Sequence, residues 1–250
     1  MHALLEGDPT LRRRFVDWNL FHVEPRFGGL RKRYRRVAAQ RNAWLKVGGP
    51  GRAVWDHEYA AVLQAVEVSR QRFFELLRAD FLALAEPFEA MGTVVPQWRS
   101  CLATGIDVRR WLEEHRAADV ARGYSFLSPS RSDFYLSKDG TAWVGSRGQN
   151  KLAGILLQLA ADRVVSRSLS QRAVWLVDDL GAELDLVTQL AVLPLLHDAS
   201  DQLVVTSLAM PPSAFELNHM ADVFHVEQGA LIPNVAPRAS PQPRHDALTD

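Results

Sequence analysis

An apolar run that ends abruptly in two adjacent carboxylates constrains the fold of this 250-residue chain more than any other feature. The run is AVWLV at residues 173–177, and Asp178 and Asp179 follow it directly. This pattern predicts a buried strand whose carboxyl end carries both acids, at the edge where open α/β sheets bind ligands. Upstream, SRGQNKLAGILLQLA at 146–160 predicts a helix whose first turn suits an anion. Together the two segments indicate a phosphate and magnesium site.

Two longer helices are predicted in the N-terminal half. A basic helix is expected at 31–46 and an amphipathic helix at 57–85, separated by the break KVGGPG. Because the connection is short, the two should pair as an antiparallel arm. The expected packing positions are Tyr34, Val37, Ala38, Asn42, Leu45, Tyr59, Val62, Val66, Phe73, Leu76, Leu77 and Phe81.

The remaining elements are expected to be shorter, and the last residues to be disordered. In chain order they are a strand at 92–98, a helix at 107–120 capped by Asp107, a β-like stretch at 124–136, a turn at 138–140, a strand before 146, a helix ending near 196, a strand at 202–206 and a hairpin of 223–226 with 230–232. The tail from residue 236 is rich in Pro, Arg and Ser, which predicts disorder.

Composition indicates a cytoplasmic globular protein. Hydrophobic residues make up 47% of the chain and charged residues 23%, which is ordinary for a soluble domain. The single cysteine, Cys101, excludes an intramolecular disulfide and is expected to be a buried thiol. No signal peptide and no membrane-spanning stretch is predicted.

The charge is distributed unevenly although the formal net charge is zero. Residues 1–52 hold 12 Lys/Arg against four Asp/Glu, and residues 171–250 hold three Arg against 11 Asp/Glu. Nine basic residues and no acid occur from 26 to 52, which favours a DNA contact and a solvated helix face equally. The candidate DNA contacts are Arg31, Lys32, Arg33, Arg35 and Arg36.

The double carboxylate resembles the Walker B motif of ABC-type ATPases. The resemblance implies that Asp178 holds Mg²⁺ and that Asp179 orients the attacking water. AELD at 182–185 resembles the D-loop at the dimer interface, which implies that Asp185 contacts the nucleotide, and Thr206 stands where these ATPases sense the γ-phosphate. The alternatives are an acidic helix cap for the acids and an ordinary strand end for the threonine.

The start of the upstream helix resembles the signature motif of the same ATPases. The resemblance implies contacts to the γ-phosphate of an ATP molecule held by the opposite subunit. Its residues are Ser146, Arg147, Gly148 and Gln149. A hydroxyl and backbone N–H groups at a helix N-terminus meet that requirement, and the alternative is a simple serine cap with a basic first turn.

The N-terminal LLEGDPTLRRRFVD at 4–17 resembles the first diagnostic motif of the RecF family of bacterial DNA replication and repair proteins. Further matches occur in the family's order and extend over nearly the whole chain except the tail. They are Asp119, RGY at 122–124, PSRSD at 129–133, VT at 205–206 and FHVEQG at 224–229. The resemblance implies an α/β fold, an ABC-type ATPase head with an inserted helical arm. An SMC-like head is disfavoured because the arm is too short for a long coiled coil.

The family resemblance also implies a function. It implies ATP and Mg²⁺ as cofactors, an ATP-dependent homodimer, and binding of single-stranded and gapped double-stranded DNA. RecO and RecR are the implied partners in loading recombinase during recombinational repair and the SOS response. The expected lobes are a remnant of the ATPase lobe at 1–27, the helical arm at 28–120, the ATPase lobe with its motifs at 121–235, and the disordered tail at 236–250.

Several positions depart from the family pattern. Gly145 stands for Leu before the signature serine, Ser128 and Ser130 for Gly and His in the turn, Ala182 for Ser in the D-loop, and Thr188 for a basic residue. These changes bear on hydrolysis more than on the fold.

The largest difference from the family pattern is that the phosphate-binding P-loop motif is missing from this sequence. No G-x-x-x-x-G-K-[ST] occurs in the sequence, and the family places it upstream of residue 4. We therefore expect a partial head without the P-loop strand, exposed apolar surface, and no tight ATP binding by this chain alone. The alternative function is a non-catalytic DNA- or partner-binding fragment without ATPase activity.

Overall fold

The structure is a computed structural model that describes residues 2–49, 54–208 and 222–233. It contains two compact units, Met1–Ser207 and Leu208–Asp250. The predicted lobe boundaries at 27/28 and 120/121 lie inside the first unit, and the predicted disordered tail from 236 lies outside the described residues. Within the described ranges, no helix has both the length and the apolar character needed to cross a membrane.

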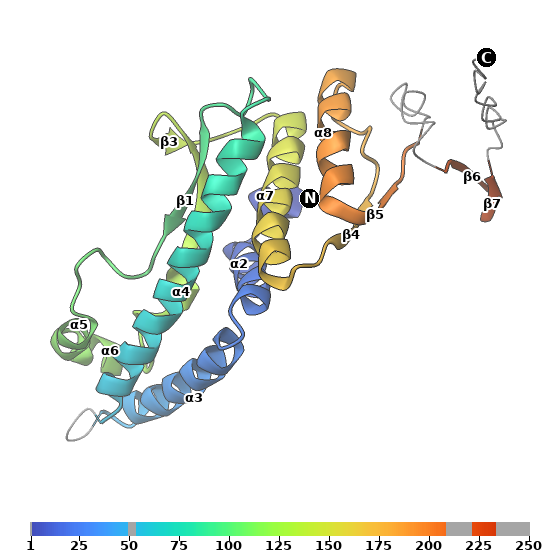
Figure 1. The fold of residues 1–250 in the computed structure, drawn as a ribbon. Helices are drawn as coiled ribbons and strands as arrows, with labels where there is room; N and C mark the ends of the chain where they lie inside the picture. Colours follow the sequence, from blue (N-terminus) through green and yellow to red (C-terminus); the bar gives the residue numbers. More distant parts are fainter. Residues whose placement is uncertain (1, 50–53, 209–221, 234–250) are drawn as a thin grey trace, which may run out of the picture. The chain divides into compact units, whose positions relative to one another are not determined.

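The first unit combines long helices with two small sheets (Figure 1). Its helices are α1 (His2–Glu6), α2 (Pro9–Val23), α3 (Phe27–Lys46), α4 (Val54–Ala85), α5 (Val108–Glu114), α6 (Arg116–Arg122), α7 (Arg147–Leu169) and α8 (Leu186–Ala199), with a 3₁₀ turn at Pro129–Arg131. Its strands are β1 (Val94–Arg99), β2 (Asp133–Lys138), β3 (Thr141–Ala142), β4 (Ala173–Val177) and β5 (Ser200–Val205).

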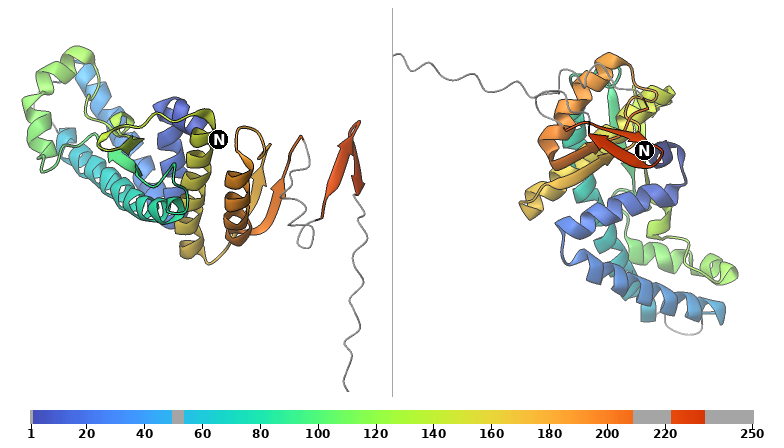
Figure 2. Two further views of the ribbon diagram at one scale, coloured as in Figure 1. Left: turned by 90° about the horizontal axis from the view of Figure 1, so that it is seen from above. Right: turned by 90° about the vertical axis from the view of Figure 1, so that its right-hand side faces the viewer.

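Helix α7 is the central element of the first unit. It contacts α1, α2, α4 and α8, and both Figure 1 and Figure 2 show it between α4 and α8. Apolar side chains are therefore buried around much of its circumference, including Leu152, Ile155, Leu156 and Leu159. A helix that is apolar on most sides is typical of such a fully packed position. The predicted helix at 146–160 is confirmed and extends further, to Leu169.

The predicted helical arm is confirmed as α3 packed on α4. Contacts such as Tyr34 with Tyr59 join the start of α4 to the middle of α3, as an antiparallel pair requires. The predicted packing positions are buried or half-buried except Leu76, which is 46% exposed. Leu76 lies on the face of α4 that borders a shallow groove with α7, so helical spacing alone wrongly predicted its burial.

The arm also contains the single cysteine. Cys101 is half-buried and packs against the cluster that includes Val37, Tyr59 and Leu112. Burial raises the pKa of the Cys101 thiol to about 12. The expected role of Cys101 as a packed thiol therefore agrees with its surroundings, although its burial is only partial.

The connection between the arm and the signature helix differs from the prediction in two places. The single helix predicted at 107–120 is wrong, because α5 and α6 are separate helices that meet at His115. The ring of His115 stacks on Trp111 with centroids 3.9 Å apart, and its Nδ1 lies 2.8 Å from the Trp111 carbonyl. The predicted Asp107 cap is confirmed, since its carboxylate accepts the Arg110 N–H at 3.1 Å.

The β-like stretch predicted at 124–136 is only partly a strand. Strand β2 begins at Asp133 and pairs antiparallel with β1, with Trp98 opposite Phe134. Its upstream residues instead serve polar contacts: Ser125 binds Asn42, and the Phe126 N–H binds Asp119. Tertiary hydrogen bonds thus override local strand propensity there.

The strand that precedes the double carboxylate is confirmed as β4, which pairs in parallel with β5. Its burial alternates: Trp175 and Val177 are 7% and 1% exposed, whereas Val174 and Leu176 are 58% and 72% exposed. The prediction that the whole strand is buried is therefore wrong, because one face packs on helices and the other faces solvent within the described residues. The expected exposed apolar surface is present here.

The second unit contains a hairpin, as predicted. Strands β6 (Phe224–Glu227) and β7 (Ala230–Pro233) pair antiparallel. The connecting residues Gln228 and Gly229 have φ values of +49° and +82°, as a two-residue type I′ turn requires.

Candidate functional site

The carboxyl end of β4 brings the predicted acids to Thr206. The Thr206 hydroxyl donates to Oδ1 of Asp178 at 2.6 Å and accepts the backbone N–H of Asp179 at 2.9 Å. The two parallel strands place these residues side by side, because the N–H of Thr206 binds the carbonyl of Val177. Sequence analysis assigned these three residues separately, and the structure joins them in one cluster.

The residues after the acids form a tight turn that leads into α8. Asp179 has φ +47°, and its carbonyl accepts the Ala182 N–H at 3.1 Å. Asp185 is the N-cap of α8: it accepts the Thr188 N–H at 2.8 Å and the Thr188 hydroxyl at 3.0 Å. These hydrogen bonds lower the pKa of Asp185 below its ordinary value of 3.8. The aspartate predicted to contact nucleotide is thus also a helix cap.

The signature residues begin α7 with a reciprocal capping box. The Ser146 hydroxyl accepts the Gln149 N–H at 3.3 Å, and the Gln149 side-chain oxygen accepts the Ser146 N–H at 2.9 Å. Arg147 is exposed on the first turn. The Ser146 hydroxyl and the positive end of the α7 dipole therefore face solvent, where an anion could reach them.

Two contacts join the signature helix to the turn at 179–183. Gly148 lies directly against the turn, since a Cβ on it would stand 2.3 Å from the carbonyl oxygen of Glu183. Lys151 is 6% exposed and donates its ammonium to the carbonyls of Asp179 at 2.5 Å and Ala182 at 2.7 Å. Sequence analysis assigned no role to Lys151. Its spacing of three residues from Gly148, which puts both on one helical face, was the available signal.

The donor set at this end fits a magnesium ion that is completed by phosphate and water. Mg²⁺ commonly takes one or two protein carboxylates and keeps several waters. Asp178 is exposed, and the hydroxyl of Thr206 is hydrogen bonded to only one of its two oxygens. In the described part of the chain no three His, Cys, Asp or Glu residues cluster as metal ligands. The chain's own residues therefore suit a nucleotide-bound Mg²⁺ better than a closed metal cage.

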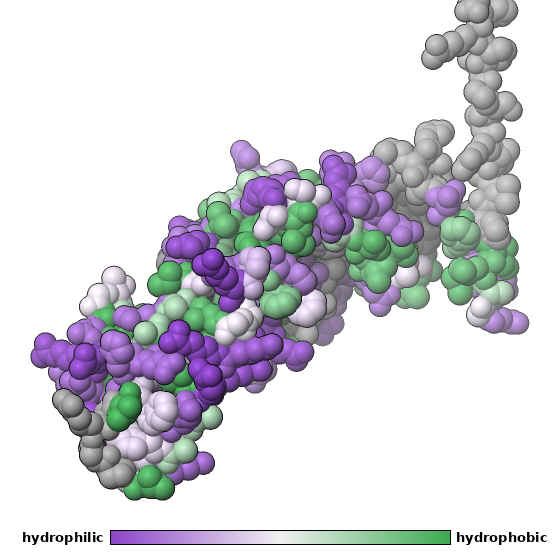
Figure 3. All heavy atoms as spheres, turned by 60° about the horizontal axis from the view of Figure 1, so that its bottom comes forward, coloured by the Kyte–Doolittle hydropathy of each residue, from purple (hydrophilic) through white to green (hydrophobic). Residues whose placement is uncertain are grey.

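The five predicted DNA contacts fall into two groups on α3. Arg31 pairs with Asp17 at 3.1 Å and Arg33 with Glu58 at 3.0 Å. The other three are exposed and form no ion pair or hydrogen bond among the described residues; they are Lys32, Arg35 and Arg36. Figure 3 turns the underside of Figure 1 forward and shows hydrophilic residues over the region of α3.

The other family motifs meet one another away from the acids. Arg12 forms a bidentate pair with Asp133, with both distances 2.8 Å. Asp17 receives two bonds from Arg70, whose Nη1 also donates to the carbonyl of Pro129. The N-terminal motif and the PSRSD turn are thus linked directly and through Arg70. These hydrogen bonds tie α2 to α4 and to β2, and α4 to the 3₁₀ turn.

Asp119, another of the residues that match the family pattern, is buried in the arm. Asp119 binds Arg41 at 2.8 Å, and Arg41 also binds Asp56 at 2.8 Å and Ser125 at 2.7 Å. Arg41 and Asp119 are fully buried. Sequence analysis counted Arg41 in the basic stretch, but its side chain belongs to the core.

Most of the positions that depart from the family pattern have local explanations. Gly145 leaves room for the Trp143 ring, which a Cβ would meet at 2.4 Å. Thr188 completes the Asp185 cap, and Ser128 and Ser130 bind each other at 2.6 Å. Nothing in the structure explains the alanine at position 182.

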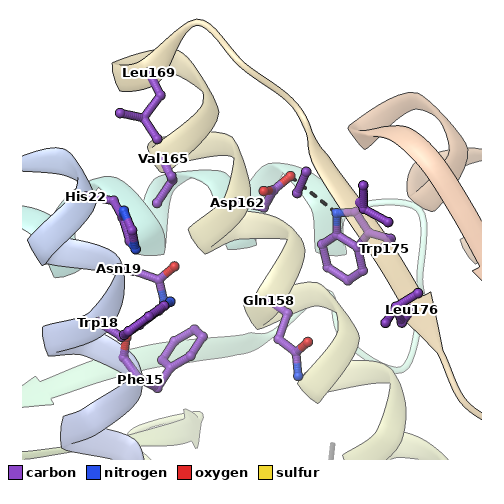
Figure 4. Close-up of a pocket in the computed structure, with 12 residues that line it drawn as sticks. Phe15, Trp18, Asn19, His22, Gln158, Asp162, Val165, Leu169, Trp175 and Leu176 are labelled. Atoms are coloured by element: carbon purple, nitrogen blue, oxygen red, sulfur yellow. Dashed lines mark hydrogen bonds between the residues drawn. The ribbon is translucent and has the colours of Figure 1, made fainter.

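A groove of about 560 Å³ lies between α2, α7 and β4. Figure 4 shows Trp18 and His22 of α2 on one side of α7 and Trp175 of β4 on the other. The indole of Trp175 donates to Asp162 at 3.4 Å, and burial raises the pKa of Asp162. Its lining includes the polar side chains of Asn19, His22, Gln158 and Asp162, but no residue of the acid cluster.

Comparisons with known proteins agree with these features. No family model matches the chain. It is 36% identical over 245 residues to the DNA replication and repair protein RecF of Stenotrophomonas maltophilia, covering 92% of this chain and 65% of that protein. It is 33% identical over 240 residues to RecF of Pseudomonas fluorescens, covering 91% and 64%. The chain thus spans slightly less than two thirds of the length of these curated relatives.

Solved structures support the fold. The recombination mediator protein RecF-ATPrS in the RecFOR pathway superposes with a TM-score of 0.71 at 17% identity, covering 93% of this chain and 65% of that chain. RecF-ATP gives a TM-score of 0.70 at 17% identity, covering 92% and 64%. The fold is therefore the predicted α/β fold of the ABC-type ATPase head with a helical arm. By fold and by similarity along nearly its whole length, this chain belongs to the RecF family of DNA replication and repair proteins.

Proposed function

We propose that the chain supplies two faces of a RecF-type ATP site. The face at Ser146 contacts the γ-phosphate of an ATP molecule held by a second subunit, in an ATP-dependent homodimer. The face at Asp178 binds the Mg²⁺ of a nucleotide on its own subunit, with Asp179 orienting the attacking water. The observation that carries this proposal is the cluster of Asp178, Asp179 and Thr206 beside the start of α7.

Each remaining site residue has a role in the same proposal. Thr206 senses the γ-phosphate through its bond to Asp178, and Asp185 orders the D-loop at the dimer interface. Arg147, Gly148 and Gln149 complete the donor face around the helix N-terminus. When bound, Mg²⁺ supplies charge neutralisation of the phosphates.

The metal part of this proposal is tested by titration with Mn²⁺ as a probe for Mg²⁺, following free Mn²⁺ by electron paramagnetic resonance. We expect Asp178→Asn to weaken Mn²⁺ binding at least tenfold, because it removes the exposed carboxylate of the cluster. Asp201→Asn, which neutralises an exposed acid elsewhere on β5, is the matched control and should bind like the wild type. Equal affinity of wild type and Asp178→Asn would contradict the assignment.

We also propose that the chain binds single-stranded and gapped double-stranded DNA through α3. Lys32, Arg35 and Arg36 support this, since they are exposed cations without partners in the described residues. In this proposal the protein acts in the cytoplasm with RecO- and RecR-type partners to load recombinase during recombinational repair and the SOS response.

DNA binding is tested by fluorescence anisotropy with labelled gapped DNA at several salt concentrations. Changing Lys32, Arg35 and Arg36 together to Glu should weaken binding and flatten its salt dependence, because phosphate contacts release counterions. The control changes three exposed cations outside α3, namely Arg72, Arg78 and Lys138, to Glu. Equal losses in both triple variants would show that α3 is only a solvated face.

A second candidate function is DNA or partner binding without ATP hydrolysis. The observation that favours it is the group of exposed cations on α3, Lys32, Arg35 and Arg36, which need no nucleotide to contact DNA phosphates. Equilibrium dialysis distinguishes the two. Micromolar, magnesium-dependent ATP binding by this chain would contradict the non-catalytic function, whereas salt-dependent DNA binding without ATP would support it.

A further inference from the structure

The buried ammonium of Lys151 is the most specific contact outside the residues assigned so far. Lys151 is 6% exposed, and Nζ donates to the carbonyls of Asp179 and Ala182 at 2.5 and 2.7 Å. Both of these hydrogen bonds go to backbone carbonyls. A buried ammonium is costly unless it is hydrogen bonded. These two carbonyls therefore hold it, and their displacement would leave it without partners.

The same helical face carries a second close contact to the turn. Gly148, three residues before Lys151, leaves no space for a Cβ beside the carbonyl oxygen of Glu183. The turn thus meets α7 through the carbonyls of Asp179, Ala182 and Glu183. Movement of the first turn of α7 relative to these carbonyls would break at least one contact.

The backbone of Asp179 depends on these contacts. Its φ of +47° is uncommon for a residue other than glycine and persists only where the surroundings hold it. The Thr206 hydroxyl accepts its N–H, and its carbonyl accepts from Ala182 and Lys151. Lys151 therefore fixes the residue that follows Asp178 and carries the second carboxylate.

We propose that Lys151 is a positioning residue that couples the signature face to the carboxylate face within one chain. The inference rests on the proposed function, in which Ser146 serves the ATP of one site and the carboxylates at 178 and 179 serve the other site of the dimer. A phosphate that displaces the start of α7 then shifts the turn through Lys151. The two nucleotide sites of the dimer thereby communicate through a single ammonium.

The contact of Lys151 with the turn at 179–183 is tested by amide hydrogen exchange on the full chain. Lys151→Met should speed exchange of the amides at 180–184 at least tenfold, because the turn loses two hydrogen bonds. Lys151→Arg should retain most of the protection, since a guanidinium can donate to the same carbonyls. Lys138→Met makes the same chemical change at an exposed lysine and should alter nothing in the turn. Unchanged exchange in Lys151→Met would overturn the proposal.

The coupling is tested by a double-mutant cycle. Ser146→Ala breaks the capping box, and in the wild-type background it should speed exchange at 180–184 at least threefold. In the Lys151→Met background the same change should add nothing to exchange in the turn. Additive effects would overturn the coupling. If Lys151→Met does not fold, as judged by exchange of the α4 core amides, Gly148→Ala replaces it because it disrupts the same interface.

Measuring Mn²⁺ affinity distinguishes a positioning role of Lys151 from a purely structural role. Lys151→Met should weaken Mn²⁺ binding three- to tenfold while the α4 amides stay protected, and Lys151→Arg should restore it. Equal Mn²⁺ affinity of wild type and Lys151→Met would overturn the positioning role. If the wild type binds no Mn²⁺, the proposed metal site fails, and the exchange cycle still decides whether Lys151 couples the two faces.

Discussion

Two groups of motif residues in this protein have opposite surroundings. The arginine–aspartate pairs of the arm and N-terminal helices are buried or half-buried, and Arg41 and Asp119 have no exposed surface. The residues at the carboxyl end of β4 and at the start of α7 are largely exposed, including Asp178, Thr206 and Ser146. Family motifs thus serve as scaffold in one region and face solvent in the other.

The two groups differ in whether their polar side chains are hydrogen bonded within the chain or left open to solvent. In the buried group, each charge is matched within the chain: Arg70 binds Asp17 and Glu67, and Arg12 binds Asp133. In the open group, hydrogen bonds satisfy backbone and capping positions but leave carboxylate and hydroxyl oxygens facing solvent. Removing a buried partner should therefore cost stability, whereas removing an open one should cost ligand binding.

The largest effect on stability is expected at Arg41. Arg41→Met should lower the free energy of unfolding by about 3–5 kcal/mol, because it leaves the Asp56 and Asp119 carboxylates buried without their shared cation. Urea denaturation followed by circular dichroism measures the change. Arg36→Met on the same helix removes an exposed cation and should cost no more than about 0.5 kcal/mol. Equal losses would show that the buried ion pairs of Arg41 contribute nothing to stability.

A smaller effect is expected where burial is incomplete. Arg12→Met should lower the free energy of unfolding by about 2 kcal/mol, since it removes charge-assisted hydrogen bonds to Asp133 and a bond to the carbonyl of Gly7. The same urea titration measures it, and Arg14→Met, at an exposed neighbouring position, is the control. A loss as large as that of Arg41→Met would mean that the exposure of an ion pair does not determine how much it stabilises the fold.

Local sequence patterns predicted the open region well. A strand that stops at paired acids, a serine three residues before glutamine, and a Gln-Gly turn each depend on neighbours within a few residues. The structure accordingly has β4, the helix that starts after Ser146 and the β6–β7 hairpin where they were predicted. These patterns indicated a phosphate and magnesium site, and the separate roles of its residues in ATP binding came from the family resemblance.

The buried region was predicted poorly because its contacts join distant residues. Arg41 meets Asp56 across 15 positions and Asp119 across 78, so nothing local distinguished it from the exposed cations of α3. Lys151 was missed for the same reason, since its partners lie 28 and 31 positions away. The break at His115 is a different case, because the stacking partner of its ring, Trp111, is only four residues away.

In the open region the expected cost in stability is lower. Thr206→Val removes one hydroxyl that bonds to Asp178 and Asp179, and it should lower the free energy of unfolding by about 0.5–1.5 kcal/mol. Thermal denaturation measures the change, and Thr141→Val, at an exposed hydroxyl of β3, is the matched control. A loss above about 3 kcal/mol would place Thr206 with the buried scaffold instead.

The smallest effect is expected at the cap of α8, and it should depend on pH. The pKa of Asp185 is lowered in the folded chain by hydrogen bonds from Thr188, so its contribution to stability is complete above the unfolded pKa of about 4. That contribution is lost as the pH falls through the lower folded pKa. Asp185→Asn keeps a capping oxygen but cannot titrate.

The melting temperatures of wild type, Asp185→Asn and Asp185→Ala at pH 7 and pH 3 therefore separate charge from cap. The difference between wild type and Asp185→Asn should shrink on acidification, while Asp185→Ala should stay below Asp185→Asn at both pH values because it has no capping oxygen. If Asp185→Asn kept the full acid sensitivity of the wild type, the carboxylate of Asp185 would contribute nothing through its charge. The open face would then use this aspartate only as a hydrogen-bond acceptor, and the pH dependence would arise at other carboxylates.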